Sequence, residues 1–250
     1  ADKRAGEFVL MSASTKQVEA VCGDCLEVLE DIPTDSVDAV ITDPPYGTAS
    51  LSKVAASQTF DHIWDRDLPL SYLEQSLRVL KPGGSFFCFT DTKRVETVWN
   101  AVEDAGLRPL QLFYWLKTNP PPQPRKNFAS GVEVGVFARK PGKINYWGGG
   151  GASVNYLQTP LAMGKDRTKH PTQKHVKVME HLVRILCPIG GVVLDPFAGS
   201  GTTGVAGLLA GRRVFLIEQD PDYYNIMVER LEKWKKSDRV RQIDLFAEEQ

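Results

Sequence analysis

The sequence predicts one α/β domain built on a single doubly wound, mostly parallel sheet. Short apolar runs alternate with segments of helical apolar spacing along most of the chain, which is the pattern of repeated strand–helix units. One of these runs, Gly191–Asp195, leads through a glycine-rich turn directly into a helical segment. The chain has 250 residues, which is enough for one large core and hardly enough for two independent ones.

Periodicity assigns the individual elements. Apolar or alternating runs predict strands at 18–21, 37–41, 85–89, 110–116, 132–138, 192–194 and 214–217. Helical spacing predicts helices at 71–80, 94–105, 173–187, 202–209 and 221–235. Lys81-Pro82-Gly83-Gly84 is expected to end the first helix as a turn, because proline cannot continue a helix and glycine accepts a positive φ.

Segments that break this alternation are expected at the two ends and in two loops. We expect 1–17 to be a flexible lead-in with the natural start at Met11, 18–240 to be the folded domain, and 241–250 to be a C-terminal tail. Residues 49–69 and 141–171 interrupt the strand–helix rhythm. Long loops on α/β scaffolds frequently carry function, so these two are candidate recognition elements.

Composition excludes several classes of protein. A hydrophobic fraction of 42% with 24% charged residues is typical of a globular chain, and no apolar run is long enough to cross a bilayer. The formal net charge of −1 means that any nucleic-acid surface must come from local clustering of basic residues. Four cysteines are too few for a disulfide framework, and Cys22 and Cys25 lack the second pair that a zinc site needs. We expect a reduced, cytoplasmic protein without a metal.

The turn Pro196–Gly201 is the first candidate binding site. Its glycines let the backbone approach a ligand, and Glu218, at the end of the next predicted strand, can accept hydrogen bonds from both hydroxyls of a ribose. Together these features predict a site for adenosine. Gly199, Gly201 and Gly204 also spell G-x-G-x-x-G, so their spacing alone leaves NAD and S-adenosylmethionine open. A P-loop is excluded because no Gly-Lys-Ser/Thr follows.

Two details favour S-adenosylmethionine over NAD. Asp195 precedes the turn, where a carboxylate suits a cationic sulfonium better than a pyrophosphate. A dinucleotide fold starting near residue 190 would also have room for only one strand–helix–strand unit and a terminal helix, whereas that fold needs two halves.

The second candidate site is Asp43-Pro44-Pro45-Tyr46, at the carboxyl end of the predicted strand 37–41. Ligands of open α/β sheets bind at that edge. Prolines cannot donate backbone hydrogen bonds, so their carbonyls and Asp43 form a rigid corner rich in acceptors. An exocyclic amino group is the matching donor, and Tyr46 can stack on the ring that carries it. Accepting its N–H bonds would aim the nitrogen lone pair at a sulfonium methyl for in-line displacement, with positioning as the main catalytic device.

With these motifs in this order, the chain resembles the amino-methylating DNA methyltransferases of the permuted type, in which the catalytic motif precedes the cofactor motif. The resemblance extends from about Val18 to Lys235 and includes Leu80–Gly84 and His170–Lys174. It implies the sheet of S-adenosylmethionine-dependent methyltransferases with inserted target-recognition loops. It also implies Asp43, Pro44, Pro45 and Tyr46 as catalytic residues.

The same resemblance implies a set of residues that bind S-adenosyl-L-methionine. These are Asp24, Cys25, His170, Thr172, Lys174, Asp195, Phe197, Gly199, Ser200, Gly201, Thr202, Thr203 and Glu218. Asp24 would meet the adenine of the cofactor and Phe197 would pack on it. Glu218 would hold the ribose and Lys174 would lie near the methionine end. Gly23 and Tyr223 fall where the family contacts the adenosine.

In this family, aspartate as the first catalytic letter goes mostly with N6 of adenine and serine mostly with N4 of cytosine. We therefore expect an enzyme that methylates N6 of an adenine flipped out of double-stranded DNA, within a short target site. N4-cytosine, RNA and protein amides remain alternatives, and so does a catalytically silent DNA-binding subunit. The motifs leave open a homodimer, a partner restriction endonuclease in a restriction–modification system, and an orphan or phage role.

Local charge supports a nucleic-acid partner. Two basic clusters share the middle of the chain: Arg125, Lys126, Arg139, Lys140 and Lys143 form the first, and Lys165, Arg167, Lys169, His170, Lys174, His175 and Lys177 form the second. Contacts of these residues to phosphates would give an affinity that falls with salt. Tyr146, Trp147, Asn155 and Gln158, in the second loop, are candidates for reading the bases.

Overall fold

An eight-stranded sheet runs through the centre of the structure, a computed structural model that describes residues 17–45, 71–120, 122, 128–162, 167–170, 172–237 and 240. The strands are β1 (Val18–Cys22), β2 (Val37–Thr42), β3 (Leu80–Thr90), β4 (Arg108–Lys117), β5 (Val132–Arg139), β6 (Tyr156–Thr159), β7 (Val192–Asp195) and β8 (Arg213–Glu218). Their order is β1-β8-β7-β2-β3-β5-β4-β6, and all neighbours are parallel except β5, which is antiparallel to both β3 and β4. The predicted single, mostly parallel sheet is confirmed.

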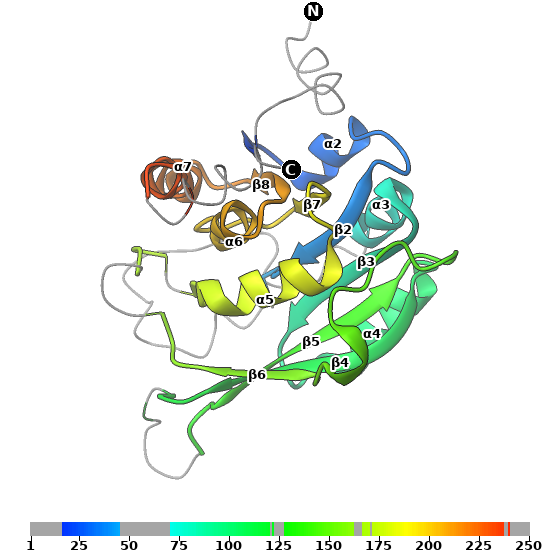
Figure 1. The fold of residues 1–250 in the computed structure, drawn as a ribbon, viewed down its shortest axis with the longest axis horizontal. Helices are drawn as coiled ribbons and strands as arrows, with labels where there is room; N and C mark the ends of the chain where they lie inside the picture. Colours follow the sequence, from blue (N-terminus) through cyan, green and yellow to red (C-terminus); the bar gives the residue numbers. More distant parts are fainter. Residues whose placement is uncertain are drawn as a thin grey trace, which may run out of the picture.

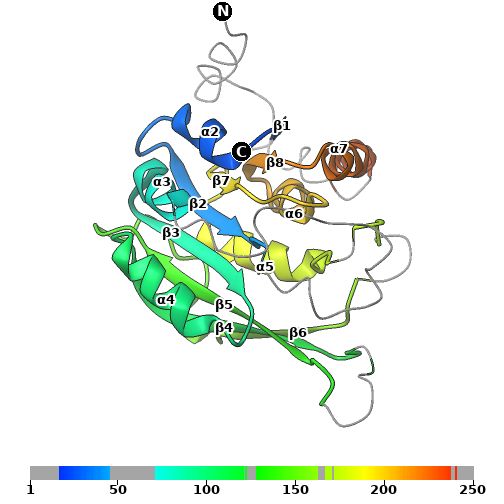
Figure 2. The same ribbon diagram turned by 180° about the vertical axis from the view of Figure 1, so that it is seen from behind.

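Helices cover both faces of this sheet (Figure 1). On one face lie α5 (Val176–Leu186), α6 (Thr202–Ala210) and α7 (Pro221–Lys235), and on the other lie α2 (Cys25–Glu30), α3 (Ser71–Val79) and α4 (Val95–Asp104), as Figure 2 shows from behind. Each face buries its own hydrophobic cluster, one beneath α5, α6 and α7 and one beneath α2, α3 and α4. β2 and β7, at the centre, are buried along their whole length.

Helix α6 is buried all round, and its glycines explain how it fits. A Cβ on Gly207 would lie 2.0 Å from Val214 Cγ2 in β8, and one on Gly204 would lie 2.7 Å from side chains of both Leu216 and Leu231. The third glycine of the G-x-G-x-x-G spacing therefore serves the packing of helix against strand rather than contact with a ligand. This packing fixes where the helix begins, at Thr202, directly after the turn.

Several predicted boundaries are wrong. Two short elements were not predicted: α2, which Asp24 caps by accepting from Leu26 N at 2.8 Å, and β6, which lies inside the expected loop 141–171 and adds an edge strand beside β4. The expected turn Lys81–Gly84 is part of β3, which accommodates it because Gly83 adopts a φ of +74° and the pairing with β2 shifts register there.

Helix α5 starts later than predicted, at Val176 rather than at residue 173. The chain is held outside the helix there because Gln173 Oε1 accepts from the backbone N–H and the hydroxyl of Thr168, at 2.7 and 2.8 Å. His175 then caps the helix through Lys177 N. Lys174 consequently lies before the helix and points into the protein, with a relative exposure of 6%.

The described part of the expected loop 141–171 crosses the α5 face of the sheet. It begins at the amino ends of the strands, where Asn145 Nδ2 donates to Asp38 Oδ1 at 3.0 Å and Gly148 N donates to Ile185 O at 2.9 Å. β6 then carries it to the carboxyl edge, where Thr118 N donates to Thr159 O. This part of the segment is therefore packed against the body of the domain.

Other predicted features fall outside the described residues: 1–16, Tyr46, the loop 49–69, Arg125, Lys126, Lys165 and the tail 241–250. Within the described part of the chain, no helix combines the length and apolar character needed to cross a membrane, and no three metal-ligating side chains cluster. Cys25 is buried, and burial raises the pKa of its thiol to about 12.

Candidate active site

The predicted site residues come together at the carboxyl edge of the sheet. Asp24 follows β1, Asp43 follows β2, Asp195 ends β7 and Glu218 ends β8. These four strands are neighbours in the order β1-β8-β7-β2, so residues from both halves of the sequence meet along one edge. The two predicted motifs, the glycine turn and Asp43–Pro45, thus belong to one site.

Asp195 organises the glycine turn. Its carboxylate accepts from Thr42 Oγ1 at 2.8 Å, Thr203 Oγ1 at 2.5 Å and Phe197 N at 3.1 Å. Burial raises the pKa of this carboxyl to about 6, although the three hydrogen bonds oppose that rise. The predicted partner of a sulfonium therefore also ties β2, the turn and α6 together.

Glu218 reaches across to the glycine turn. Its Oε2 accepts from Gly199 N at 2.7 Å and its Oε1 accepts from Asp220 N at 2.9 Å. Burial raises the pKa of Glu218, because the carboxylate has little water around it. Gly199 and Gly201 adopt φ values of +52° and +73°, so glycine is required at both positions to hold this turn.

His170 and Tyr223 form a wall beside the turn. Their ring centroids are 4.3 Å apart, and a Cβ on Gly199 would lie 3.0 Å from His170 Nε2. Burial and the nearby cations Lys174 and Arg167 lower the pKa of His170 to about 4, so the ring is neutral at pH 7. Its Nδ1 is buried and has no hydrogen-bond partner among the described residues, which is the state expected where a ligand supplies one.

Other predicted cofactor residues are used by the fold itself. Ser200 and Thr202 bind the guanidinium of Arg230, whose Nη1 donates to Ser200 O at 3.0 Å and Thr202 Oγ1 at 3.0 Å. Phe197 is half-buried and meets Tyr72 edge-on, with ring centroids 5.1 Å apart. Thr172 is exposed. Arg230 and Tyr72 were not predicted, because neither belongs to a recognisable local pattern.

Lys174 lies in the catalytic part of the site. Its Nζ pairs with Asp43 Oδ2 and, at 2.9 Å, with Glu133 Oε2. Burial alone would lower the pKa of Lys174, but the two carboxylates raise it, so the side chain is charged at pH 7. Pro44 is buried and Pro45 is exposed. The sequence had placed Lys174 near the methionine end of the cofactor, and it gave no role to Glu133.

The residues around the turn fit an adenosine-containing cofactor. Glu218 presents a half-buried carboxylate, Gly199 has no side chain to fill the space beside His170, and His170 Nδ1 has no hydrogen-bond partner among the described residues. Asp24 follows β1 and Phe197 follows β7, with β8 between these two strands at the same edge of the sheet. The donors and acceptors suit a ribose and a purine rather than a phosphate group.

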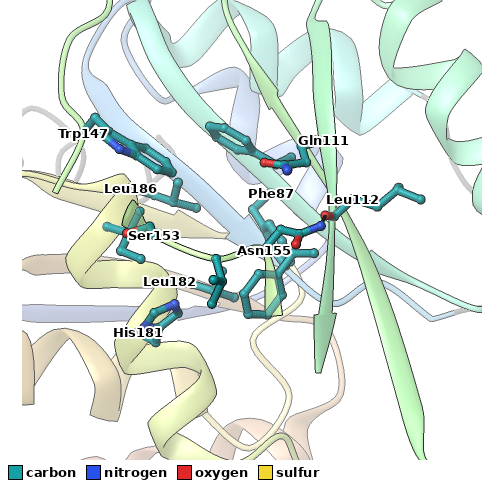
Figure 3. Close-up of a pocket in the computed structure, with 13 residues that line it drawn as sticks. Phe87, Gln111, Leu112, Trp147, Ser153, Asn155, His181, Leu182 and Leu186 are labelled. Carbon is teal, nitrogen blue, oxygen red and sulfur yellow. Dashed lines mark hydrogen bonds between the residues drawn. The ribbon is translucent and has the colours of Figure 1, made fainter. Parts of the chain in front are cut away.

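A separate cavity lies between α5 and strands β3 to β5, on the same face of the sheet (Figure 3). Trp147, Ser153, Asn155, Phe87, Gln111 and His181 are among the residues that line it. None of its lining residues is among the predicted catalytic or cofactor residues. Two candidates for base reading, Trp147 and Asn155, therefore line this cavity.

Comparison with known proteins agrees with this geometry. The profile of the family described as DNA methylase (N6_N4_Mtase) matches residues 37–229. Among curated proteins, the type II methyltransferase M2.LlaDCHI of Lactococcus lactis subsp. cremoris is 29% identical over 85% of this chain and 88% of its own length. The type II methyltransferase M2.MboI of Moraxella bovis is 25% identical over 83% of this chain and 85% of its own length.

Solved structures share the fold. The M1.HpyAVI–SAM complex superposes with a TM-score of 0.68, at 26% identity over 86% of this chain and 100% of that chain. The cytosine-N4-specific PvuII DNA methyltransferase superposes with a TM-score of 0.71, at 20% identity over 92% of this chain and 93% of that chain. The second likeness, at this identity, concerns the fold alone.

Proposed function

The chain belongs to the DNA methylase family, and from this premise we propose that it transfers a methyl group from S-adenosyl-L-methionine to the exocyclic N6 of adenine in double-stranded DNA. The observation that carries the proposal is the meeting of Asp43 and the glycine turn at one edge of the sheet. Thr42, directly before Asp43, donates to Asp195, directly before the turn, at 2.8 Å. The amine acceptor and the cofactor turn are thus joined by one hydrogen bond.

We propose a separate role for each of these site residues. Glu218 holds the ribose of the cofactor, Asp24 and Phe197 contact its adenine, and His170 closes the pocket beside Gly199. When bound, the cofactor supplies an electrophilic methyl group on a sulfonium. Asp43 and the Pro44 carbonyl accept hydrogen bonds from the two N–H groups of the target amine. This directs the nitrogen lone pair toward the turn.

The target base has to leave the duplex to reach Asp43, because an amino group inside the stack is out of reach of a half-buried carboxylate. Double-stranded DNA is therefore the proposed partner. Gln158 lies in β6, Arg167 and Lys169 lie between β6 and the site residue His170, and all three are exposed, so we place DNA contacts on them. Tyr146 lies at the other edge of the sheet, where its hydroxyl donates to Arg184 O at 3.4 Å, and it is a weaker candidate for base reading.

Adenine is favoured over cytosine because aspartate stands first in the catalytic motif, as the family resemblance implies. Both amines offer two N–H donors, so hydrogen bonding alone does not separate them. N4 of cytosine is the alternative target, as in the similarly folded PvuII enzyme by its name.

The test is incubation of the purified chain with unmethylated genomic DNA and S-adenosyl-L-methionine, followed by nucleoside mass spectrometry. N6-methyldeoxyadenosine is the expected product, and an Asp43→Ala variant run in parallel should give none. N4-methyldeoxycytidine would overturn the choice of base and keep the class of reaction. Methylation of RNA or protein in place of DNA would overturn the proposed partner.

A further inference from the structure

Four buried or half-buried charged side chains of alternating sign form a row at the catalytic edge. Asp43 Oδ2 contacts Lys174 Nζ, Lys174 Nζ lies 2.9 Å from Glu133 Oε2, and Lys117 Nζ lies 2.7 Å from Glu133 Oε1. Each oxygen of Glu133 therefore holds a different ammonium group. Only the first member of the row belongs to the catalytic motif.

The sheet fixes the far end of this row. Glu133 pairs with Trp115 across the β4–β5 ladder, and strand alternation puts Glu133, Trp115 and Lys117 on the face that α5 covers. Lys117 Nζ lies 5.4 Å from the centroid of the Trp115 ring, and Lys174 Nζ lies 4.9 Å from that of Phe89. Both ammonium groups thus lie over aromatic rings of β4 and β3, the two strands that flank β5.

The pKa shifts of Glu133 and Lys174, the two middle residues of the row, both favour the charged forms. Burial opposes ionisation of Glu133, but the ammonium groups of Lys174 and Lys117 hold its pKa below the usual value. The pKa of Lys174 is raised by its two carboxylate neighbours despite burial. One cation is accordingly shared between two anions.

We propose that Glu133 is a positioning residue for methyl transfer. It shares the ammonium group of Lys174 with Asp43, and Lys174 pairs mainly with Glu133 once the target amine binds to Asp43. The inference deepens the proposed function and rests on the role given there to Asp43. As the N–CH3 bond forms, the bond from the sulfonium to the methyl group breaks with its electron pair left on sulfur, and the nitrogen carries a positive charge until it releases one proton to solvent. Asp43 has to face that charge with its own negative charge intact. An ammonium bound by Asp43 alone would cancel the charge and compete for the same oxygen atoms.

The two far members of the row should act in opposite directions. Glu133→Gln removes the competing anion, so Lys174 pairs with Asp43 alone. Asp43 then becomes a weaker hydrogen-bond acceptor for the target amine. Lys117→Met removes the second cation from Glu133 and keeps an unbranched side chain over Trp115. Glu133 then attracts Lys174 more strongly, and the ion pair between Lys174 and Asp43 becomes weaker. A merely structural row would lose activity in both variants.

The experiment measures single-turnover methylation of unmethylated genomic DNA, with the dissociation constant of S-adenosyl-L-methionine and the melting temperature of each variant. Glu133→Gln is expected to slow the chemical step by about 10- to 100-fold, the loss that follows when one charge-assisted interaction is misdirected. Its cofactor affinity should stay within about threefold of the parent. Lys117→Met should not slow the step, and Glu133→Asp should recover part of the rate.

The matched control removes an ion pair that has no part in the catalytic edge or the basic clusters. Lys235→Met removes a 2.7 Å ion pair to Glu232 at the end of α7 and should leave the rate unchanged. Equal losses in Glu133→Gln and Lys117→Met would overturn the inference, and so would an unchanged rate in Glu133→Gln. If Glu133→Gln does not fold, a slowed Lys117→Met overturns the inference and an unslowed one supports it. Retained turnover in Asp43→Ala would instead refute the proposed function, so the two failures are distinguishable.

Discussion

Replacement of Glu218 by glutamine tests the proposed ribose site most directly, since it keeps the shape of the side chain and removes its charge. In the structure Glu218 Oε2 accepts from Gly199 N at 2.7 Å and Oε1 accepts from Asp220 N at 2.9 Å. Each oxygen has capacity for one more donor, which the two ribose hydroxyls would fill. The amide NH2 cannot accept, so one hydrogen bond to a charged group is lost, worth about 1.5–3 kcal/mol.

That loss corresponds to a cofactor dissociation constant about 10- to 150-fold higher. Isothermal titration of S-adenosyl-L-methionine into parent and variant measures it. Glu180→Gln, which removes the 2.8 Å pair with Arg184 on α5, is the control and should bind normally. The amide also meets a backbone N–H of the turn, so the melting temperature should fall slightly. A dissociation constant within twofold of the parent in a folded Glu218→Gln would refute the ribose assignment.

Three further predictions concern catalysis, pH and packing. Asp43→Ala should abolish turnover, measured by tritium transfer to DNA, while titration calorimetry still detects cofactor binding; a loss of binding instead would contradict the catalytic role. Because burial raises the pKa of Asp195 from 3.8 to about 6, the folded chain binds this proton more tightly than the unfolded chain, and the residue adds stability as the pH falls. Between pH 7 and pH 5, the free energy of unfolding measured in urea should rise by about 1 kcal/mol less in Asp195→Asn than in the parent. An equal rise in the two proteins would contradict the prediction. Gly207→Ala should cost about 1–3 kcal/mol of unfolding free energy, because the new Cβ would lie 2.0 Å from Val214, whereas Gly151→Ala, with open space around it, should cost far less; equal costs would refute the packing argument.

Local patterns predicted most of the fold because strands and helices bury one face each. The strands around 37–41, 85–89, 132–138, 192–194 and 214–217 are present, as are the helices near 71–80, 94–105, 202–209 and 221–235. The short β6 was missed because four residues on an edge strand carry little periodic signal. The start of α5 was misjudged because Gln173 accepts a hydrogen bond from Thr168, five residues earlier, and this local contact outweighs the helical spacing.

The site divides in the same way. Asp43–Pro45 and the glycine turn could be found from the sequence, since each is a contiguous motif next to an apolar strand. Arg230, which donates to Ser200 and Thr202, could not be found, because these partners lie 30 and 28 residues away along the chain. A strand was predicted at 132–138, but no pattern within one strand indicates which cations lie against Glu133.

The sequence by itself therefore determined the class of fold, the family and the two motifs that meet at one edge of the sheet. The tertiary structure alone decided how charge is distributed there. Lys174 reaches Asp43, 131 residues away along the chain, and shares its ammonium with Glu133 of another strand. The physical reason is that apolar periodicity is a local property of the chain, whereas ion pairs between buried side chains depend on which strands the fold makes neighbours.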